Sequence, residues 1–452
     1  MTQRRGLGPA SLAAALGLLL VIAPACRGGG ASGPRPSTGA VPFIAVDPAS
    51  ASPTDRAIAK AQQALQANPA DKQSRLDLAN AFLQKVRETA DPSLYVKARG
   101  LLDPLLKASP ADPGVLVAAG TLALAQHRFD DARSIGRRAL AAAPDSEGAL
   151  GVLVDADNEL GRYDEALTTT QRMADVRPNL AALSRVSYAR ELRGDYPGAV
   201  EAMTEAVTAG GSDGGENVAY VEVLLGNLLL TTGDLDGARA SYDAAESSFP
   251  GFAAAKAGRA QLDVALGRPA DAAELLADVV KVQPLAQYAI AQGDALRAAG
   301  QSTAAQQAYD LVGVIGKLYA ANGVNVDLEL ALFDADHHPG AASVAKARRA
   351  LEARPSTLGH DVLAWNLFRA GGSSHLAEAA KQSAMALALG SRDPQERYHA
   401  AAIAFARGDR AGATADLQIV LAENPRFSAA LAPEVADLAG RLGLSVPPPP
   451  SS

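Results

Sequence analysis

The sequence predicts an all-α solenoid of about ten stacked helical hairpins, because one small-residue pattern recurs along most of the chain. The spacing between successive copies is 33 to 39 residues. The markers are Ala98, Ala132, Ala166, Ala199, Ala238, Ala272, Ala305, Ser343, Ala377 and Ala413. A period of this length is typical of repeats that pack on their neighbours and present an extended surface.

Turn residues accompany the markers and support the hairpin interpretation. A glycine stands five residues before most markers, at Gly161, Gly194, Gly233, Gly267, Gly300 and Gly408. A proline follows most markers by about twelve residues, at Pro110, Pro144, Pro178, Pro250, Pro284, Pro355 and Pro425. Glycine relieves a tight turn between two helices, and proline ends the second helix. Each copy is therefore expected to contain two antiparallel helices, A and B.

The repeat region is predicted to cover residues 52–444, with elements that depart from the regular pattern. A preceding helix is expected over 53–68 and a capping helix within 427–444. Insertions are expected at 88–94 and 210–216, and the stretch 313–323 is the least regular. The last residues, 445–452, are expected to be a disordered tail.

The repeat unit resembles the tetratricopeptide repeat. Its clearest copy, 219–252, carries Leu225-Gly226, Gly233, Ala238, Tyr242 and Pro250 at the expected places. This resemblance implies a right-handed superhelix whose concave wall is formed by the A helices. The large aromatic residue common in helix A of that family is generally missing here.

The first 25 residues have the pattern of an export signal. Arg4 and Arg5 precede an apolar stretch, 10–23, that is too short to span a membrane as a mature helix. Cys26, the single cysteine, follows directly and resembles the acylated cysteine of bacterial lipoproteins. The alternative is ordinary cleavage after Ala25, which leaves a free thiol. Residues 26–51, rich in Gly, Pro, Ser and Ala, are expected to form a flexible tether.

No residue pattern in the chain argues for catalysis or for a cofactor. Phosphate-loop, dinucleotide, nucleophile-elbow and zinc-protease motifs are absent. His337 and His338 stand beside Asp334 and Asp336, but solvated turn residues are a better interpretation than a metal site. The net charge of −7, without a basic stripe, argues against nucleic-acid binding.

Partner binding is expected on the concave wall, at the inward-facing ninth position of helix A. The candidates there are Asp155, Tyr188, Asn227, Gln261, Asp294 and Trp365, joined by Phe368 and Arg369 one turn after the tryptophan. Mixed polar and aromatic side chains at this position are unusual against the alanine-rich background, although they could simply face solvent inside the superhelix. No lysine occupies the fifth position, so the family's clamp for a peptide carboxylate is not expected.

The sequence therefore favours a non-catalytic protein-interaction scaffold of the bacterial cell envelope. It is expected to be an outer-membrane lipoprotein facing the periplasm and to contact the membrane through its amino-terminal lipid alone. The alternative is a soluble periplasmic module, without acylation, that binds a peptide or a glycan. The sequence does not name the partner.

Overall fold

The computed structural model describes residues 41–47, 52–211 and 214–449, and these residues form 22 α-helices and no β-strand. The predicted signal, Cys26 and most of the predicted tether lie outside the described residues. Helices α2 to α21 pair consecutively into ten hairpins, with α1 (Pro53–Ala67) before them and α22 (Ala432–Leu442) after them. The predictions of an all-α repeat fold, a preceding helix and a cap are confirmed.

The A helices are α2 (Lys72–Thr89), α4 (Pro113–Ala125), α6 (Glu147–Glu159), α8 (Leu180–Glu191), α10 (Glu216–Thr231), α12 (Ala253–Ala265), α14 (Ala286–Ala298), α16 (Asp327–His337), α18 (Thr357–Ala370) and α20 (Pro394–Ala406). The B helices are α3 (Ser93–Ala108), α5 (Phe129–Ala142), α7 (Tyr163–Val176), α9 (Tyr196–Gly210), α11 (Leu235–Ser248), α13 (Pro269–Val282), α15 (Ser302–Ala321), α17 (Ala341–Ala353), α19 (Ser373–Ala386) and α21 (Arg410–Glu423). Helix α15 is the longest, at 20 residues, and covers most of the stretch expected to be irregular.

Sequence signals at the helix ends explain where the hairpins turn. Side chains of Asp71, Asp112 and Ser146 accept hydrogen bonds from backbone N–H groups in the first turns of α2, α4 and α6. The six predicted turn glycines all adopt φ between +68° and +84°. Such angles are costly for residues with a Cβ atom, so glycine at these turns is a backbone requirement.

The marker residues are buried in nine of the ten hairpins, and the exception corrects the predicted register. Ala377 is exposed, whereas Ala379 is completely buried. Ala379, Ser383 and Ala386 repeat the buried spacing of Ala413, Leu417 and Val420 in the next hairpin. Helix α19 begins about one turn earlier, relative to its buried residues, than most other B helices, so the marker lies two residues later than predicted.

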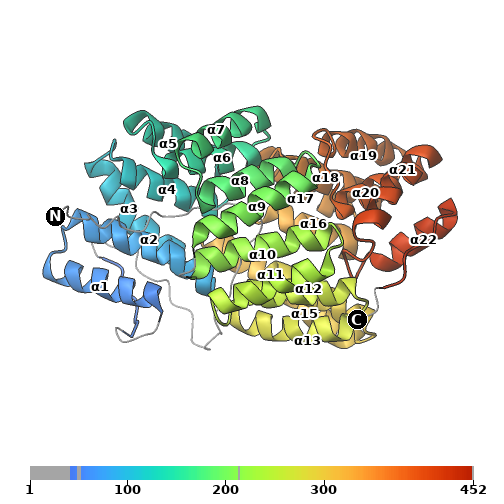
Figure 1. The fold of residues 1–452 in the computed structure, drawn as a ribbon, viewed down its shortest axis with the longest axis horizontal. Coiled ribbons are helices and arrows are strands. Elements are labelled where there is room, and N and C mark those ends of the chain that lie inside the picture. Colours follow the sequence, from blue (N-terminus) through green and yellow to red (C-terminus); the bar gives the residue numbers. More distant parts are fainter. Residues whose placement is uncertain (1–40, 48–51, 212–213, 450–452) are drawn as a thin grey trace.

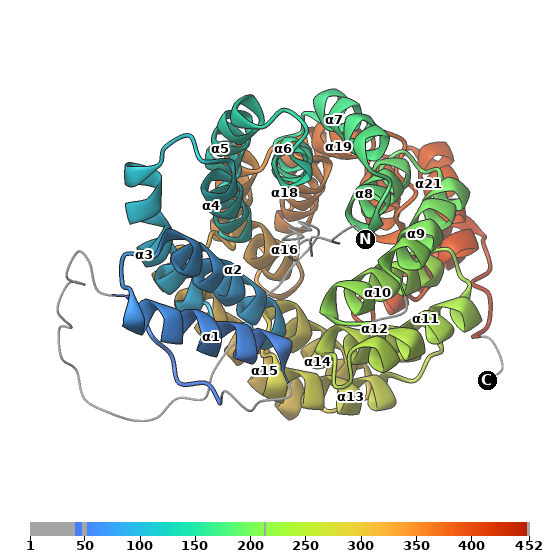
Figure 2. The same cartoon turned by 60° about the vertical axis from the view of Figure 1, so that its left-hand side comes forward.

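The ten hairpins coil through two superhelical turns that stack directly on each other (Figures 1 and 2). We call α1–α11 the first turn and α12–α22 the second turn. Figure 2 looks nearly along the axis of the coil, with the A helices on the inside and the B helices on the outside. One hydrophobic cluster contains residues 58–122 of the first turn and 253–333 of the second, so the core runs across the boundary.

Most polar contacts between the two turns join residues 194 to 198 positions apart, although the Tyr319 hydroxyl donates to the carbonyl of Ala90 at a separation of 229. Gln283 donates hydrogen bonds to the carbonyl oxygens of Arg87 and Glu88, and Gln126 donates one to the carbonyl of Asn322. Further along, the Tyr163 hydroxyl accepts a hydrogen bond from the backbone N–H of Thr357 at 2.6 Å. The nearly constant separation means that one superhelical turn takes slightly fewer than six repeats of 34 residues.

A buried ion-pair cluster also joins the two turns. Arg354 lies between Glu159 of the first turn and Glu329 of its own turn, and all three residues are less than 9% exposed. Beside this cluster the backbones approach closely: a Cβ atom on Gly161 would lie 2.3 Å from the carbonyl oxygen of Pro355. Stacking of the turns therefore depends both on charge pairing and on the small size of a turn glycine.

The described part of the predicted tether, 41–47, packs on the body of the protein. The backbone N–H of Ile44 donates to the side-chain oxygen of Gln62, whose amide nitrogen donates back to the carbonyl of Ile44. Val41, Ile44 and Val46 also pack against the large core cluster. This segment is thus held against α1, which differs from the free tether expected there. None of the described helices is long and apolar enough to cross a membrane.

Candidate partner-binding cavity

The inside of the second turn contains a cavity of about 220 Å³. Five successive A helices, α12, α14, α16, α18 and α20, contribute to its lining, and residues 427–431 before α22 close one side. We call this space the axial cavity. Its polar lining consists of Gln261, Gln287, Asp294, Glu329, Asp336, His337, Gln395 and Ser428. Its apolar lining includes Ile290, Leu328, Leu332, Phe333, Phe427 and Leu431.

A larger hollow of about 560 Å³ lies among α13, α14 and α15. Its lining is mainly alanine, glutamine and two acidic residues, without an aromatic side chain. Because binding pockets are usually lined by apolar and aromatic side chains with a few polar groups among them, the axial cavity is the better candidate.

Two of the predicted groove residues, Gln261 and Asp294, line the axial cavity. Asp294 accepts a hydrogen bond from the Tyr309 hydroxyl at 2.8 Å, and its Oδ1 lies 3.4 Å from Nε2 of His337. Gln261 is exposed. The concave wall therefore places these two ninth-position side chains where the repeat pattern predicted them.

Three other predicted groove residues belong to the first turn and lie outside this cavity. Asp155 is 3% exposed and forms a bidentate ion pair with Arg185, whose Nε and Nη2 donate to the two carboxylate oxygens at 2.8 and 2.6 Å. Asn227 is exposed and accepts a hydrogen bond from the Tyr242 hydroxyl at 2.9 Å. Tyr188 is half-buried, and burial raises its pKa well above the usual value. Asp155 thus cannot offer its carboxylate to a partner, which corrects the expectation of an accessible side chain.

Trp365 was expected to be an inward-facing anchor, but it is completely buried. Its ring stacks on His399 at a centroid distance of 4.0 Å, and its Nε1–H donates to Asp336 at 2.8 Å. In the hairpins of Asp155, Tyr188, Asn227, Gln261 and Asp294 the groove position lies eleven residues before the marker. Eleven residues before the corrected marker Ala379 is Phe368, three residues after Trp365. Phe368 is half-buried and stacks on Trp365.

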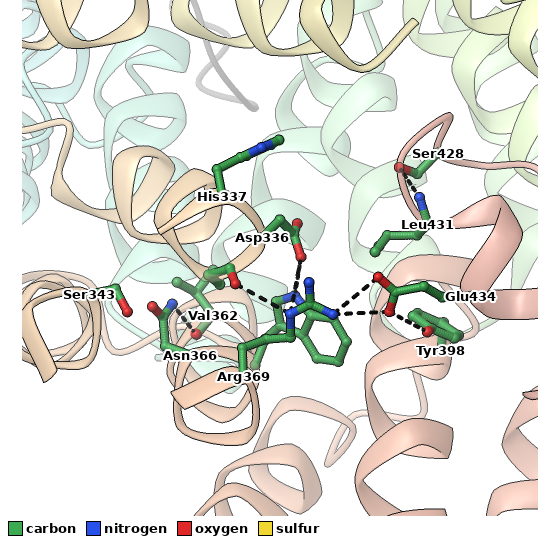
Figure 3. A network of polar contacts seen from close by, with 12 residues as sticks. Asp336, His337, Ser343, Val362, Asn366, Arg369, Tyr398, Ser428, Leu431 and Glu434 are labelled. Atoms are coloured by element: carbon green, nitrogen blue, oxygen red, sulfur yellow. Dashed lines mark hydrogen bonds and ion pairs between the residues drawn. The ribbon is translucent and has the colours of Figure 1, made fainter. Parts of the chain in front are cut away.

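Arg369, the third residue of the predicted cluster, joins α18 to the carboxyl-terminal cap (Figure 3). Its Nη1 donates to both carboxylate oxygens of Glu434, at 3.0 and 3.1 Å, and the Tyr398 hydroxyl donates to Glu434 as well. Arg369 also lies 3.9 Å from Asp336, whose pKa is raised by burial. The network positions Asp336 at the cavity wall and holds α22 against α18 and α20.

Sequence reasoning missed the cavity residues contributed by α16, namely Glu329, Asp336 and His337. They share one face of the helix with Leu332, because 329, 332, 333 and 336 are separated by three or four residues. Leu332 occupies the ninth position of α16. The residues three before it and four after it, which lie on the same face of the helix, are Glu329 and Asp336. No group of three or more potential metal ligands occurs among the described residues.

The side chain of His337 is a neutral hydrogen-bonding group in this arrangement. Arg297, which can only donate, lies 3.1 Å from Nδ1 of the ring. Nδ1 therefore accepts, and the proton is assigned to Nε2, which faces Asp294. The ring is packed between Tyr309 and Phe333, with both centroid distances at 4.4 Å. The axial cavity consequently has three carboxylates in its lining and no cationic side chain.

The fold and this site define a helical-repeat protein with an internal concave surface. A tetratricopeptide-repeat family model matches residues 123–186 and 229–295, and a second model with the same description matches 95–147. The chain therefore contains tetratricopeptide repeats over residues 95–186 and 229–295. The family comparison thus agrees with the hairpins, turn glycines and small marker residues described above.

Similar proteins include cellulose synthase operon protein C of Pseudomonas fluorescens strain SBW25, 26% identical over 178 residues. That match covers 37% of this chain and 14% of the relative's length. A thermophilic tetratricopeptide-repeat protein from Thermus thermophilus is 21% identical, with a TM-score of 0.37, over 46% of this chain and 100% of that structure. A tetratricopeptide-repeat protein from Parabacteroides merdae ATCC 43184 is 17% identical, with a TM-score of 0.39, over 54% of this chain and 97% of that structure.

Proposed function

We propose that this protein is a non-catalytic interaction scaffold of the bacterial cell envelope that holds an extended segment of a partner protein in the axial cavity. The observation that carries the proposal is the lining itself: five successive A helices turn amides, carboxylates and apolar side chains toward one space. Amides and carboxylates can pair with an extended backbone, while the apolar residues accept side chains. Tetratricopeptide repeats are protein-interaction modules, which supports a protein partner.

The envelope location rests on the export-signal pattern of residues 1–25 and on Cys26. We propose that Cys26 carries lipid and attaches the protein to the outer membrane on its periplasmic side, since multiple acyl chains anchor stably. Replacing Cys26→Ser should move the protein from the membrane to the soluble periplasmic fraction. Unchanged fractionation, or mass spectrometry showing an unmodified mature amino terminus, would contradict the lipoprotein proposal.

Site-specific photo-crosslinking in cells tests the binding surface. A benzoylphenylalanine residue at position 261, exposed at the cavity, should give a discrete adduct with a partner protein. The matched control carries it at position 278, exposed on the B helix α13. The double variant Gln261→Trp and Gln287→Trp, which fills the cavity with indole rings, should abolish partner co-purification. Adducts from position 278 alone would place binding on the outer face.

A second candidate is a glycan-binding module. It is favoured by the match to a protein named for a cellulose synthase operon. Titration with cellohexaose would show heat release, with a dissociation constant in the micromolar to millimolar range, if the cavity takes a glycan. No heat release together with a position-261 protein adduct would leave the scaffold as the supported function.

A further inference from the structure

We infer that the partner segment bound in the axial cavity carries a lysine or arginine side chain flanked by apolar residues. This inference rests on the proposed function and names the chemistry of the partner. It follows from three properties of the cavity: its charge, an unpaired buried carboxylate oxygen, and its size.

The charge of the cavity lining is negative. Asp294, Glu329 and Asp336 contribute carboxylates, whereas His337 is neutral in the arrangement described above. Arg354 and Arg369 offset the charges of Glu329 and Asp336 from outside the lining. Among the described residues, Asp294 contacts the Tyr309 hydroxyl and the neutral imidazole. Asp294 therefore keeps a carboxylate charge that a cation from a partner can neutralise.

Glu329 gives a second, independent indication of a missing donor. It is 6% exposed, and its Oε1 accepts from Arg354 at 3.2 Å. Its other oxygen, Oε2, is buried and finds no hydrogen-bond partner among the described residues. A buried carboxylate oxygen left without a donor costs free energy, and a native structure rarely keeps one without reason. An ammonium or guanidinium group is the donor that best matches a carboxylate.

The size of the cavity favours a side chain over a separate small molecule. Pockets for drug-sized ligands usually measure about 300–1,000 Å³, whereas the axial cavity measures about 220 Å³. Leu328, Leu332 and Phe427 can cover the methylene stem of a long cationic side chain while its head reaches a carboxylate. Apolar residues on either side of that cation would pack on the remaining wall.

The test uses a displayed library of random nonapeptides selected on the full chain. Selection on the parent protein should enrich peptides with one Lys or Arg between apolar residues. Asp294→Asn should recover at least about tenfold fewer of them, since a charge-assisted contact of this kind is worth about one decade or more in affinity. The matched control is Asp278→Asn, an exposed carboxylate on α13, which should recover them as the parent does.

Calorimetry on one enriched peptide removes the dependence on protein variants. Its acetyl-lysine form, neutral but of similar length, should bind at least about tenfold more weakly. Glu329→Gln, with its folding checked by circular dichroism, should weaken the parent peptide in the same direction. Equal affinity of the lysine and acetyl-lysine forms overturns the inference.

The outcomes separate this inference from the proposed function. Peptides that bind the parent, fail to bind the Gln261→Trp and Gln287→Trp double variant, but show no cationic preference overturn the inference and leave the scaffold proposal standing. Enrichment of acidic peptides likewise overturns the inference of a cationic side chain and leaves the scaffold proposal standing. Absence of any enriched peptide, or equal recovery by the filled-cavity variant, overturns both.

Discussion

The two superhelical turns share one repeat but use their interiors differently. In the first turn, Asp155 and Arg185 pair inside the wall, and Arg87 of α2 donates to Glu216 of α10 at 2.9 Å. In the second turn the corresponding space is the axial cavity. The edges of the turns differ as well. A Cβ atom on Gly161 or Gly194 of the first turn would clash with a backbone carbonyl of the second turn, whereas one on Gly300 or Gly408 would have no described atom of another segment within 4 Å.

This difference teaches that side chains at equivalent repeat positions decide whether a concave wall is structural or open. Asp155 and Asp294 both occupy the ninth position of helix A. Asp155 meets an arginine from the next A helix, whereas Asp294 meets a tyrosine hydroxyl and a neutral histidine. The Asp155 carboxylate is therefore neutralised inside the folded protein, whereas the Asp294 carboxylate remains available at the cavity.

The largest expected effect comes from breaking the contact that joins the turns. Arg354→Ala leaves Glu159 and Glu329 buried without their cation, which should cost about 3–5 kcal/mol of unfolding free energy. Urea unfolding followed by circular dichroism measures the loss. Arg348→Ala, which removes an exposed pair with Glu378, should cost less than about 1 kcal/mol. Equal losses would mean that the turns do not depend on this cluster.

The two ninth-position aspartates should respond differently to the same substitution. Asp155→Ala strands the buried Arg185 and should cost about 3 kcal/mol. Asp294→Ala removes the hydrogen bond from the Tyr309 hydroxyl and the 3.4 Å contact with His337 at a more accessible place and should cost about 1 kcal/mol. Thermal melts of the two variants, run side by side, measure the contrast. A smaller loss for Asp155→Ala would contradict the inference that Asp155 is structural whereas Asp294 is available at the cavity.

Two turn glycines offer a matched test of the stacked edge. Gly161 and Gly408 have similar φ angles, +68° and +84°, so alanine at either should cost about 1 kcal/mol for the left-handed conformation. Only Gly161→Ala also places a methyl group against the Pro355 carbonyl, which is backbone and cannot rotate away. Its loss, measured by urea unfolding, should be at least about twice that of Gly408→Ala. Similar losses would indicate that the turns separate easily.

The smallest expected effect is a pH dependence at the boundary between the turns. Burial, with a contribution from Asp393, raises the pKa of Glu191 to about 7 from 4.5. Between those values the unfolded chain ionises first, so stability should fall as pH rises from about 4.5 to about 7 and then stay constant. Because Glu191 is partly accessible, we expect about 1 kcal/mol from it.

Glu191→Gln should therefore flatten that part of the stability–pH curve and stabilise the protein at pH 8. Melting temperatures from pH 4.5 to 8 measure it. Burial also raises the pKa of Asp393 and Glu396 on the facing turn, so part of the slope should remain in the variant. An unchanged curve would assign the whole dependence to the second turn.

The repeat spacing was enough to predict the hairpins, the turn glycines and the placement of Gln261 and Asp294, because these depend on contacts between neighbouring repeats. It failed at Ala377, where an earlier start of α19 shifts the register, and at Trp365, which lies in the core instead of the expected groove. The stacking of the turns could not be predicted, since a partner such as Glu159 for Arg354 depends on the pitch of the whole coil.

Contacts at a fixed separation of 194 to 198 residues change how this repeat array can be altered in evolution. An ordinary array gains or loses one unit at little expense, because each unit meets only its neighbours. Here the removal of a single hairpin from the middle would displace every later contact between the coils by about one unit length. The number of repeats is therefore constrained by the geometry of the coil. The ten hairpins are expected to unfold together in one cooperative transition rather than as separate modules.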